Sequence, residues 1–405
     1  LEAVLEDGAV SAHAVSANPP LAGLSAVEVM DAVVESLGRR GLMVVLDEHT
    51  GKADWCCDVR DGDGLWYSEA YSEAQWIAAL ARLAQRYQSN PMVVGIELRN
   101  EIRPVVVPSS EGGGGGRVVM PTWGDGNLAT DWAAAATRAG NAVLAANPKL
   151  LVVVGGLDFG LDLRGVRDHP VTLDMPGKLV YSAHHYLWSC PACLGDKKKL
   201  WEYLDEHWGF VAKEGVAPVW LSEFGTPHTP DGYASSQQPA APRAAAGAES
   251  ASQGGDAGAS FAPPHAAATA AGGGSEEGGE EERHWQDARQ QEYSSQQAQW
   301  WNWMVDYLRS EHPGLSFAYW PLDGTQSSGR TRERGAEETY GLLNANWDAP
   351  YSRGHLAQVT ALIAEPHVRP SLSSASPGAA TQEAASRAGA TQVGATIGTR
   401  GMGEL

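Results

Sequence analysis

The chain has 405 residues, 43% of them hydrophobic, which is enough for one large domain or two ordinary ones. Its formal net charge of −20 argues against nucleic acids and anionic membranes as partners, because both require a basic surface. Fifteen tryptophans are a high number for a side chain that is unfavourable to expose without a use. No apolar run is long enough to predict a transmembrane helix.

The four cysteines are Cys56, Cys57, Cys190 and Cys193, and they allow three pairings. The segment "CPAC" resembles half of a zinc or redox site, but no second CxxC accompanies it. We therefore favour disulfides in loops, formed in an oxidising compartment. The chain begins with Leu1 and shows no leader pattern, so we interpret it as a fragment or processed product of a secreted, extracellular protein.

Short apolar segments alternate with amphipathic ones along the chain. The predicted strands span residues 41–49, 92–98, 150–154, 178–186, 217–225 and 315–320. The predicted helices span residues 27–40, 72–87, 130–146, 200–208, 296–309 and 354–364. Continuous apolar strands separated by helices are typical of βαβ units, so we expect a parallel sheet buried on both faces.

Two segments lack the large apolar side chains that a packed core needs. Residues 231–282 are rich in Ala, Gly, Ser and Pro, and the tail over 370–405 is similar. Both are expected to be disordered, because they bury too little surface to offset chain entropy. The predicted organisation is one domain over 1–369, interrupted by the 231–282 insert, followed by the tail.

The Gly-rich segment 111–116 is expected to be a flexible loop, since it lacks the GK[ST] ending of a phosphate-binding loop.

Polar or aromatic residues stand at the carboxyl ends of nearly all the predicted strands. They are His49, Glu101, His184, Tyr186, Glu223 and Trp320. A (β/α)8 barrel collects its site from the ends of several strands in this way. A doubly wound sheet would place its site near a Gly-rich βα turn, which is absent from the sequence. We therefore predict a barrel, although two of its eight strands are missing.

Glu101 and Glu223 each follow a clean apolar strand, and a pair of carboxylates is what hydrolysis of a glycosidic bond requires. Asn100 supplies an amide for a sugar hydroxyl, and Trp320 a flat apolar surface for a sugar ring. Taken alone, each of these residues is more often structural. A zinc site built from His49, His184 and His185 is a third interpretation, which lacks a convincing further ligand.

Six segments together carry a specific resemblance to a known family. They read "NPPLAGLSAVEVMDAVVESLGRRGLMVVLDEHT", "GLWYSEAYSEAQWIAALARLAQRYQSNPMVVGIELRNEIRP", "WGDGNLATDWAAAATRAGNAVLAANPKLLVVVGG", "LVYSAHHYLWS", "PVWLSEFGT" and "FAYWPLDG". In combination they resemble the cellulase family of glycoside hydrolases, family five. The resemblance extends from about residue 18 to residue 364, apart from the insert.

This resemblance implies a retaining (β/α)8 barrel that acts on β-linked glucans without a metal or other cofactor. It implies that Glu101 in "RNE" is the acid/base and Glu223 in "SEFG" the nucleophile. Asn100 matches the amide that contacts the 2-hydroxyl of the sugar. The other residues that match the sugar-binding positions of the family are His49, His184, Tyr186 and Trp320.

The chain also departs from the family. The family's first two strands, and an Arg that hydrogen-bonds the nucleophile, would precede Leu1, so we expect an incomplete barrel with two unpaired edges. Ile102 stands where the family usually has Pro after Asn-Glu, which we expect the loop to tolerate.

The leading hypothesis is a monomeric enzyme that cleaves internal β-1,4 linkages of cellulose-type glucans. The alternatives are a mannan-cleaving member of the same family and a truncated, non-catalytic barrel that binds carbohydrate. The expected partner is a β-linked polysaccharide, with no nucleic acid and no membrane involved.

Overall fold

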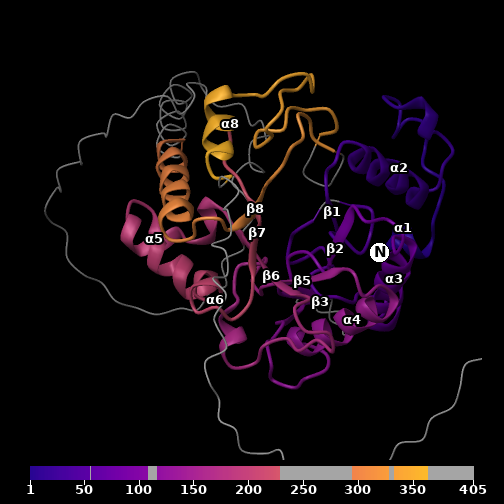
Figure 1. Cartoon of the computed structure of the whole chain (residues 1–405), viewed down its shortest axis with the longest axis horizontal. Helices are drawn as coiled ribbons and strands as arrows, with labels where there is room; N and C mark the ends of the chain where they lie inside the picture. The colour runs from indigo at the N-terminus through magenta and orange to yellow at the C-terminus, as the bar shows by residue number, and fades with distance from the viewer. Residues whose placement is uncertain (55, 108–115, 229–293, 328–332, 364–405) are drawn as a thin grey trace, which may run out of the picture. The chain divides into compact units, whose positions relative to one another are not determined.

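A six-stranded parallel sheet organises the part of the chain that the computed structural model describes, which is residues 1–54, 56–107, 116–228, 294–327 and 333–363 (Figure 1). Its order is β1-β2-β5-β6-β7-β8, and every neighbouring pair is parallel. The strands are β1 (Val44–Asp47), β2 (Val93–Glu97), β5 (Leu151–Gly155), β6 (Leu179–His185), β7 (Val219–Phe224) and β8 (Ser316–Tyr319). The predicted insert over 231–282 and the tail over 370–405 lie outside the described residues.

Helical segments connect successive strands, as a βαβ chain requires. The longer ones are α2 (Ala26–Arg39), α3 (Glu73–Arg86), α4 (Trp132–Ala146), α5 (Lys197–Leu204), a helix over residues 294–310, and α8 (Arg353–Thr360). Short ones are α1 (Glu2–Leu5), α6 (Phe210–Lys213), the 3-10 turns η1 (Pro19–Leu21), η2 (Arg164–Arg167), η3 (Leu187–Ser189) and η4 (Pro191–Cys193), and the π-helical turn η5 (Asp205–Gly209). The six predicted strands and six predicted helices are therefore confirmed, with small shifts at their ends.

The helix starts are encoded locally in the sequence. Ser25 accepts a bond from the backbone of Glu28, whose side chain accepts one in return, and this capping box begins α2. Ser72 and Gln75 form the same motif at the start of α3. Asp131 caps α4 by accepting from Ala134 N. These caps satisfy backbone N–H groups that would otherwise lack a partner.

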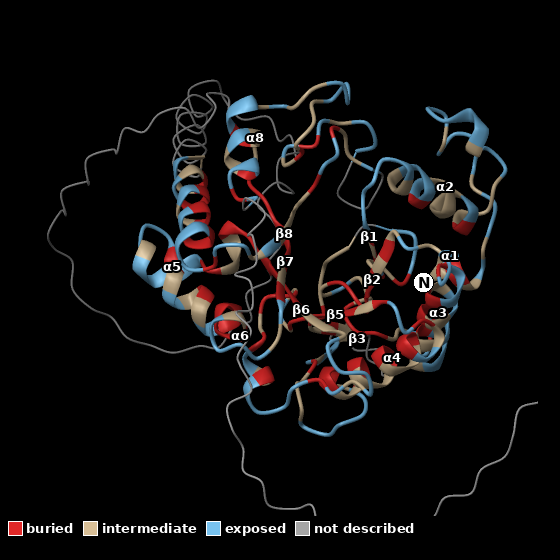
Figure 2. Ribbon diagram, in the orientation of Figure 1, coloured by how far each residue is buried: buried red, intermediate tan, exposed pale blue. Residues whose placement is uncertain are grey.

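Buried tryptophans fasten the helices to the ends of the strands. The indole N–H of Trp76 on α3 donates to Leu98 O at 3.0 Å, and that of Trp132 on α4 donates to Gly155 O at 2.8 Å. The two rings lie 6.0 Å apart, and Trp66 lies 5.6 Å from Trp132. Figure 2 shows the buried residues along the strands and on the inner faces of the helices. Several tryptophans therefore form part of the core that supports the strand ends.

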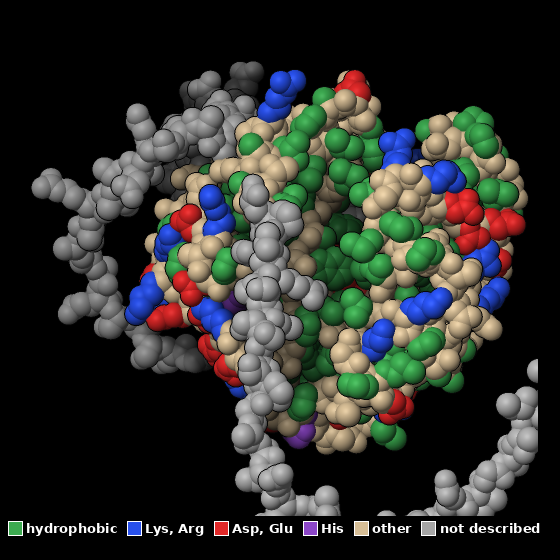
Figure 3. All heavy atoms as spheres, viewed as in Figure 1, with side chains coloured by type: hydrophobic (Ala, Val, Ile, Leu, Met, Phe, Trp, Pro, Cys, Tyr) green, Lys and Arg blue, Asp and Glu red, His purple; other side chains and the backbone are tan. Residues whose placement is uncertain are grey.

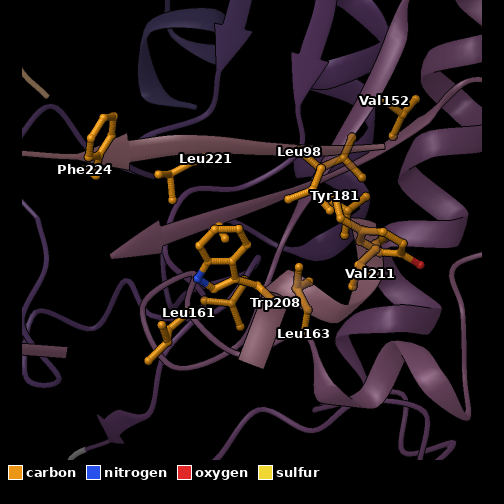
Figure 4. Packing of buried hydrophobic residues seen from close by; sticks show 14 of the residues in the cluster. Leu98, Val152, Leu161, Leu163, Tyr181, Trp208, Val211, Leu221 and Phe224 are labelled. Carbon is orange, nitrogen blue, oxygen red and sulfur yellow. The ribbon is translucent and has the colours of Figure 1, made fainter. Parts of the chain in front are cut away.

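The second half of the sheet has its own aromatic packing. Trp208, on η5, lies beside Leu161 and Leu163 of the segment that follows β5 (Figure 4). The backbone supports this contact, because Leu163 N donates to His207 O at 2.9 Å. The helix predicted over 200–208 extends further than expected, because η5 and α6 follow α5 without a break.

Two details of the described residues differ from the prediction. The strand predicted from residue 41 begins at Val44, because Leu42 and Met43 are exposed before it. An antiparallel hairpin of β3 (Val105–Val107) and β4 (Arg117–Val119) flanks the Gly-rich segment, where only a loop was expected.

The surface of the described residues is mixed in character. On the face that Figure 3 shows, hydrophobic side chains line a hollow near the middle, and most charged ones lie around it. Among the described helices, none has both the length and the apolar character that crossing a membrane requires.

Candidate active site

The carboxyl ends of five strands bring the predicted residues to one end of the sheet. Parallel neighbours end on the same side, so residues far apart in sequence become neighbours in space. By strand they are His49 after β1, Asn100 and Glu101 after β2, His184 and Tyr186 at β6, Glu223 in β7 and Trp320 after β8.

Glu101, His184 and Glu223 form the centre of this group. One oxygen of each carboxylate and Nδ1 of His184 all lie within 4.8 Å of one another. The Nδ1 atom is 3.0 Å from Glu101 Oε1 and 3.5 Å from Glu223 Oε2. Gly160, with φ of +80°, permits this position, because a Cβ there would lie 2.9 Å from the His184 ring.

His184 and the carboxylate of Glu223 favour each other's charged forms. Burial acts to lower the pKa of His184, but the charges of Glu223 and Glu101 raise it to about 10. Burial also raises the pKa of the Glu223 carboxyl, and the His184 imidazolium opposes that rise. At neutral pH the imidazole is therefore protonated, and it holds a positive charge between two carboxyl groups.

Tyr186 adds a second hydrogen-bond donor to Glu223. Its hydroxyl donates to Glu223 Oε2 at 3.0 Å. The ring stacks on Trp188, with centroids 4.6 Å apart, and Tyr340 packs edge-on against both rings. Burial and the charge of Glu223 raise the pKa of Tyr186 well above its usual value, so the phenol keeps its proton. Sequence reasoning missed Trp188 and Tyr340, although "HHYLWS" places Trp188 just past the strand.

His49 follows β1 and Trp320 follows β8, which are the first and last strands in the order of the sheet, yet their rings stack on each other. Their ring centroids are 5.2 Å apart and nearly parallel. The Nδ1 atom of His49 lies 2.7 Å from Asp47 Oδ2. Burial acts to lower the pKa of His49, but the hydrogen bond to Asp47 and its charge raise it to about 9. One face of the Trp320 indole is thus covered by an imidazole.

Asn100 lies beside a disulfide bond. Its backbone N–H donates to Glu48 O at 3.0 Å, which fixes the start of the segment after β2. The side-chain Nδ2 is 3.7 Å from the sulfur of Cys56 and 3.7 Å from that of Cys57. The two cysteines are bonded to each other. Although the residue is buried, its amide therefore lies next to weak acceptors rather than in a strong hydrogen bond.

Two buried arginines, which sequence reasoning missed, hold the segment that carries Glu101. Arg99 pairs with Asp63 at 2.9 Å, and Arg103 pairs with Asp61 at 2.5 Å. Arg103 also donates to the backbone carbonyl of Glu101 at 2.9 Å. Glu101 itself has φ of +43°, a conformation that non-glycine residues adopt only when their surroundings impose it. The segment "RNEIR" was the available signal, because two arginines flank the predicted site residues Asn100 and Glu101.

A further carboxyl group lies within the sheet, close to the centre. Glu97 is buried at 4% exposure, and its Oε1 accepts a bond from Ser182 Oγ at 2.5 Å. Burial and the charge of Asp47 raise the pKa of Glu97 to about 8. The group is therefore largely neutral at pH 7. A glutamate inside the apolar run "VVGIEL" was the signal that sequence reasoning passed over.

The three-histidine zinc interpretation is wrong. Adjacent residues of a strand point to opposite faces, and His185 packs against Tyr203 and Trp300 while His184 contacts the glutamates. Burial lowers the pKa of His185 to about 3. Among the described residues, these histidines and His49 do not form a group with converging ligand atoms.

The cysteine pairing that the sequence left open is local. Cys56 bonds Cys57, and Cys190 bonds Cys193. Both disulfides lie in loops, as expected. The "CPAC" segment is a closed disulfide in this structure, so its two sulfurs are not available as the ligands of half a zinc site.

Comparison with known proteins identifies the family. A sequence model described as cellulase (glycosyl hydrolase family 5) matches residues 9–252, which is more than half of the chain. The chain belongs to glycosyl hydrolase family 5. It is 36% identical over 231 residues to an endoglucanase of Paenibacillus polymyxa, covering 51% of this chain and 51% of that protein. It is 39% identical over 142 residues to the major extracellular endoglucanase of Xanthomonas campestris, covering 35% of this chain and 25% of that protein.

The present chain spans about half of the length of the first relative and a quarter of the length of the second. Among solved structures it resembles the endocellulase of the archaeon Pyrococcus horikoshii, with a TM-score of 0.57 and 24% identity over 86% of this chain and 77% of that chain. The catalytic domain of the Xanthomonas campestris enzyme gives a TM-score of 0.54 at 24% identity, over 86% of this chain and 78% of that chain. These likenesses show the fold. The predicted (β/α) barrel is confirmed, with six parallel strands among the described residues.

Proposed function

We propose that this family 5 protein is a retaining glycoside hydrolase that cleaves internal β-1,4 linkages of cellulose-type glucans. Glu101 acts as the acid/base and Glu223 as the nucleophile. The observation that carries the proposal is the close approach of the two side chains, whose carboxylate oxygens lie within 4.8 Å of each other. Retaining enzymes hold their carboxyl groups about 5–5.5 Å apart, whereas inverting enzymes leave about 6.5–9.5 Å for a water molecule.

The reaction has two steps. In the first, Glu223 attacks the anomeric carbon while Glu101 gives its proton to the departing glycosidic oxygen, which leaves a glycosyl ester on Glu223. In the second, Glu101 takes a proton from water, the water oxygen attacks the anomeric carbon, and the Glu223 carboxylate leaves. The configuration of the anomeric carbon is inverted twice and so is retained.

The partners of each carboxyl group suit these roles. A nucleophile must be an anion, and the Tyr186 hydroxyl and the protonated His184 both stabilise the charge on Glu223. Burial favours the neutral acid and raises the pKa of Glu223, and the charge of His184 opposes that rise. Glu101 must alternate between acid and base, and its contact with His184 holds the carboxyl group in position.

The substrate class rests on the relatives and on the sugar-binding side chains. Proteins similar to this chain are named endoglucanases, and the Pyrococcus horikoshii endocellulase has been solved in complex with cellotetraose. In our proposal Asn100 contacts the 2-hydroxyl of the sugar at the cleavage point, and the Trp320 indole packs against its ring. His49 orients Trp320, and His184 and Tyr186 orient the two glutamates.

We also propose that the catalytic unit is residues 1–369, including the 231–282 insert, and that the protein is secreted. The name of the Xanthomonas campestris relative includes the word extracellular. Two disulfides suit an oxidising compartment.

The test uses two kinds of substrate and one variant. Reducing-sugar release from carboxymethylcellulose, mixed-linkage glucan and mannan is measured for the wild-type chain and for Glu101→Gln. Hydrolysis of an aryl cellobioside with an activated phenolate leaving group is measured in parallel. We expect Glu101→Gln to lower kcat/KM on the glucans about 10²–10⁴-fold, because their leaving groups need the acid. The activated substrate should lose far less.

An equal loss on both substrates would contradict the acid role of Glu101. Release from mannan but not from the glucans would contradict the proposed substrate class. Absence of hydrolysis on all of them would favour a barrel that binds carbohydrate without cleaving it.

A further inference from the structure

The Cys56–Cys57 disulfide lies against the proposed active site. Its sulfurs are each 3.7 Å from the amide nitrogen of Asn100, and the Cys56 sulfur is 3.6 Å from His49 Nε2. Both sulfurs also lie within 4.8 Å of a carboxylate oxygen of Glu101. Three of the proposed catalytic and sugar-binding side chains therefore contact or closely approach one disulfide.

The loop that carries this disulfide is fastened to the segment that carries Glu101. Within the loop, Gly51 N donates to Asp63 Oδ2 at 2.8 Å. The buried arginines on either side of Asn100 and Glu101 pair with two aspartates of the same loop. The backbone adds a further tie, because Val106 N donates to Val59 O at 2.7 Å. The disulfide is therefore placed at the site by ion pairs and backbone bonds on both sides of it.

The second disulfide provides a contrast within the same molecule. Cys190 and Cys193 are each 6% exposed and belong to the hydrophobic core cluster. Cys56 and Cys57 are partly exposed, and their sulfurs lie among polar side chains of the proposed site. The two bonds thus differ in surroundings and in access.

The chemistry of the disulfide explains how it acts on its neighbours. Disulfide sulfur is a weak hydrogen-bond acceptor and carries no charge. It occupies the space beside the Asn100 amide without competing for a sugar hydroxyl, whereas two free thiols would separate and open that space. A side chain displaced by about 1 Å from its productive position can cost on the order of 10²-fold in rate.

We propose that the Cys56–Cys57 disulfide is a positioning element of the sugar site. It holds the Asn100 amide in place for the 2-hydroxyl of the sugar at the cleavage point, and turnover depends on its being oxidised. This inference rests on the proposed hydrolase function and adds to it a disulfide that determines recognition of the 2-hydroxyl.

The test compares Cys56→Ala/Cys57→Ala with the matched control Cys190→Ala/Cys193→Ala in the full chain. Each protein is assayed on an aryl cellobioside and on its analogue without the 2-hydroxyl on the sugar at the cleavage point. We expect the first variant to lose about 10–100-fold in kcat/KM on the parent substrate and to keep nearly all its activity on the analogue. The control variant should keep the wild-type ratio between the two substrates, whatever it does to Tm.

A double-mutant cycle with Asn100→Ala separates positioning from general damage. If the disulfide acts through Asn100, its removal should have little further effect on the parent substrate in the Asn100→Ala background. Additive losses, or a loss of equal size on both substrates, would overturn the inference.

Chemical reduction gives an independent measurement if the double variant does not fold. A small dithiol supplies two electrons and two protons to the Cys56–Cys57 bond, producing two thiols while the reagent closes to a cyclic disulfide. We expect activity on the parent substrate to fall with an unchanged near-ultraviolet circular dichroism spectrum, and to return on reoxidation. The control variant should respond in the same way as wild type.

The two possible failures are distinguishable. A wild-type chain that is active and insensitive to loss of the Cys56–Cys57 bond overturns this inference alone. A wild-type chain that is inactive on both substrates overturns the proposed function together with it.

Discussion

The two glutamates are almost equally accessible, with side chains 14% and 11% exposed, yet they are held in different ways. Glu101 lies in the segment after β2, in a positive-φ conformation, and its backbone is fixed by Arg103. Glu223 lies within β7, where the ladder fixes its backbone. Its carboxylate has two donors among the described residues, the Tyr186 hydroxyl at 3.0 Å and His184 Nδ1 at 3.5 Å, whereas that of Glu101 has one, His184 Nδ1 at 3.0 Å.

This difference corresponds to the two chemical tasks. A group that alternates between acid and base should have few donors that favour one protonation state, whereas a nucleophile benefits from donors that keep it ionised. The sheet fixes the position of Glu223, which lies in β7. The ion pairs of Arg99 and Arg103 fix the segment that carries Glu101. The comparison leads to four predictions, in order of decreasing effect.

The largest effect should follow removal of either carboxyl group. We expect Glu223→Ala to lower kcat by roughly 10⁴-fold or more, because the covalent intermediate no longer forms. Added azide separates the roles when an activated aryl cellobioside is the substrate. In Glu223→Ala it should enter from the nucleophile's side and give a glycosyl azide of inverted configuration. In Glu101→Ala it should react with the glycosyl-enzyme and give the retained configuration, as nuclear magnetic resonance of the products would reveal. The opposite pair of configurations would exchange the two assignments.

The ion-pair side of the comparison is tested by Arg103→Met. This change removes the counter-charge of the largely buried Asp61, which keeps only bonds from the backbone N–H groups of Asp58 and Asp63, and should reduce the free energy of unfolding by about 3 kcal/mol. That corresponds to a fall in Tm of about 5 °C in a thermal unfolding experiment, because the unfolding entropy is about 2.1 cal/mol/K per residue. A matched surface change, Arg39→Met, removes an exposed pair and should shift Tm by less than about 2 °C. Equal shifts would mean that the buried pair does not hold the loop.

The hydrogen-bond side of the comparison is tested by Tyr186→Phe. The ring and its stacking on Trp188 remain, and only the donor to Glu223 is lost. We expect kcat to fall about 10-fold, since one hydrogen bond to a charged group is worth about 1.5 kcal/mol. In the profile of kcat/KM against pH, the basic limb should keep its position, while the acidic limb should shift to higher pH because the pKa of Glu223 rises. An unchanged acidic limb would indicate that the hydroxyl does not stabilise the nucleophile.

The smallest effect concerns stability against pH. The folded pKa values of His49, His184 and Glu97, about 9, 10 and 8, all exceed the unfolded values of about 6.5 for histidine and 4.3 for glutamate. The folded state therefore binds more protons. The stability that the two histidines contribute declines as pH rises from about 6.5 towards 10, and that of Glu97 declines from about pH 4.3 to about 8. We expect Tm to fall by a few degrees between pH 6.5 and 9, with a shallower fall in Glu97→Gln. A Tm that rises over this interval would contradict the raised values.

Several features of this molecule could be predicted because their causes are local. Capping boxes at Ser25 and Ser72 fix the starts of α2 and α3, and alternation of apolar runs with amphipathic ones fixes the order of strands and helices. The positions of Glu101 and Glu223 at strand ends followed from the same pattern. Glu97 was missed for a related reason, because a carboxyl group inside an apolar run gives no hint that burial and Ser182 will keep it neutral.

The sequence by itself determined the parallel order, the family and the set of residues that reach the carboxyl ends of the strands. These properties depend on periodicity and on motifs within a few residues of one another. Only the tertiary structure decided that His184 rather than His185 contacts the glutamates, that Cys56 bonds Cys57 beside Asn100, and that an imidazole covers one face of Trp320. Those outcomes depend on the register and packing of strands that are distant in sequence, and local patterns do not carry that information.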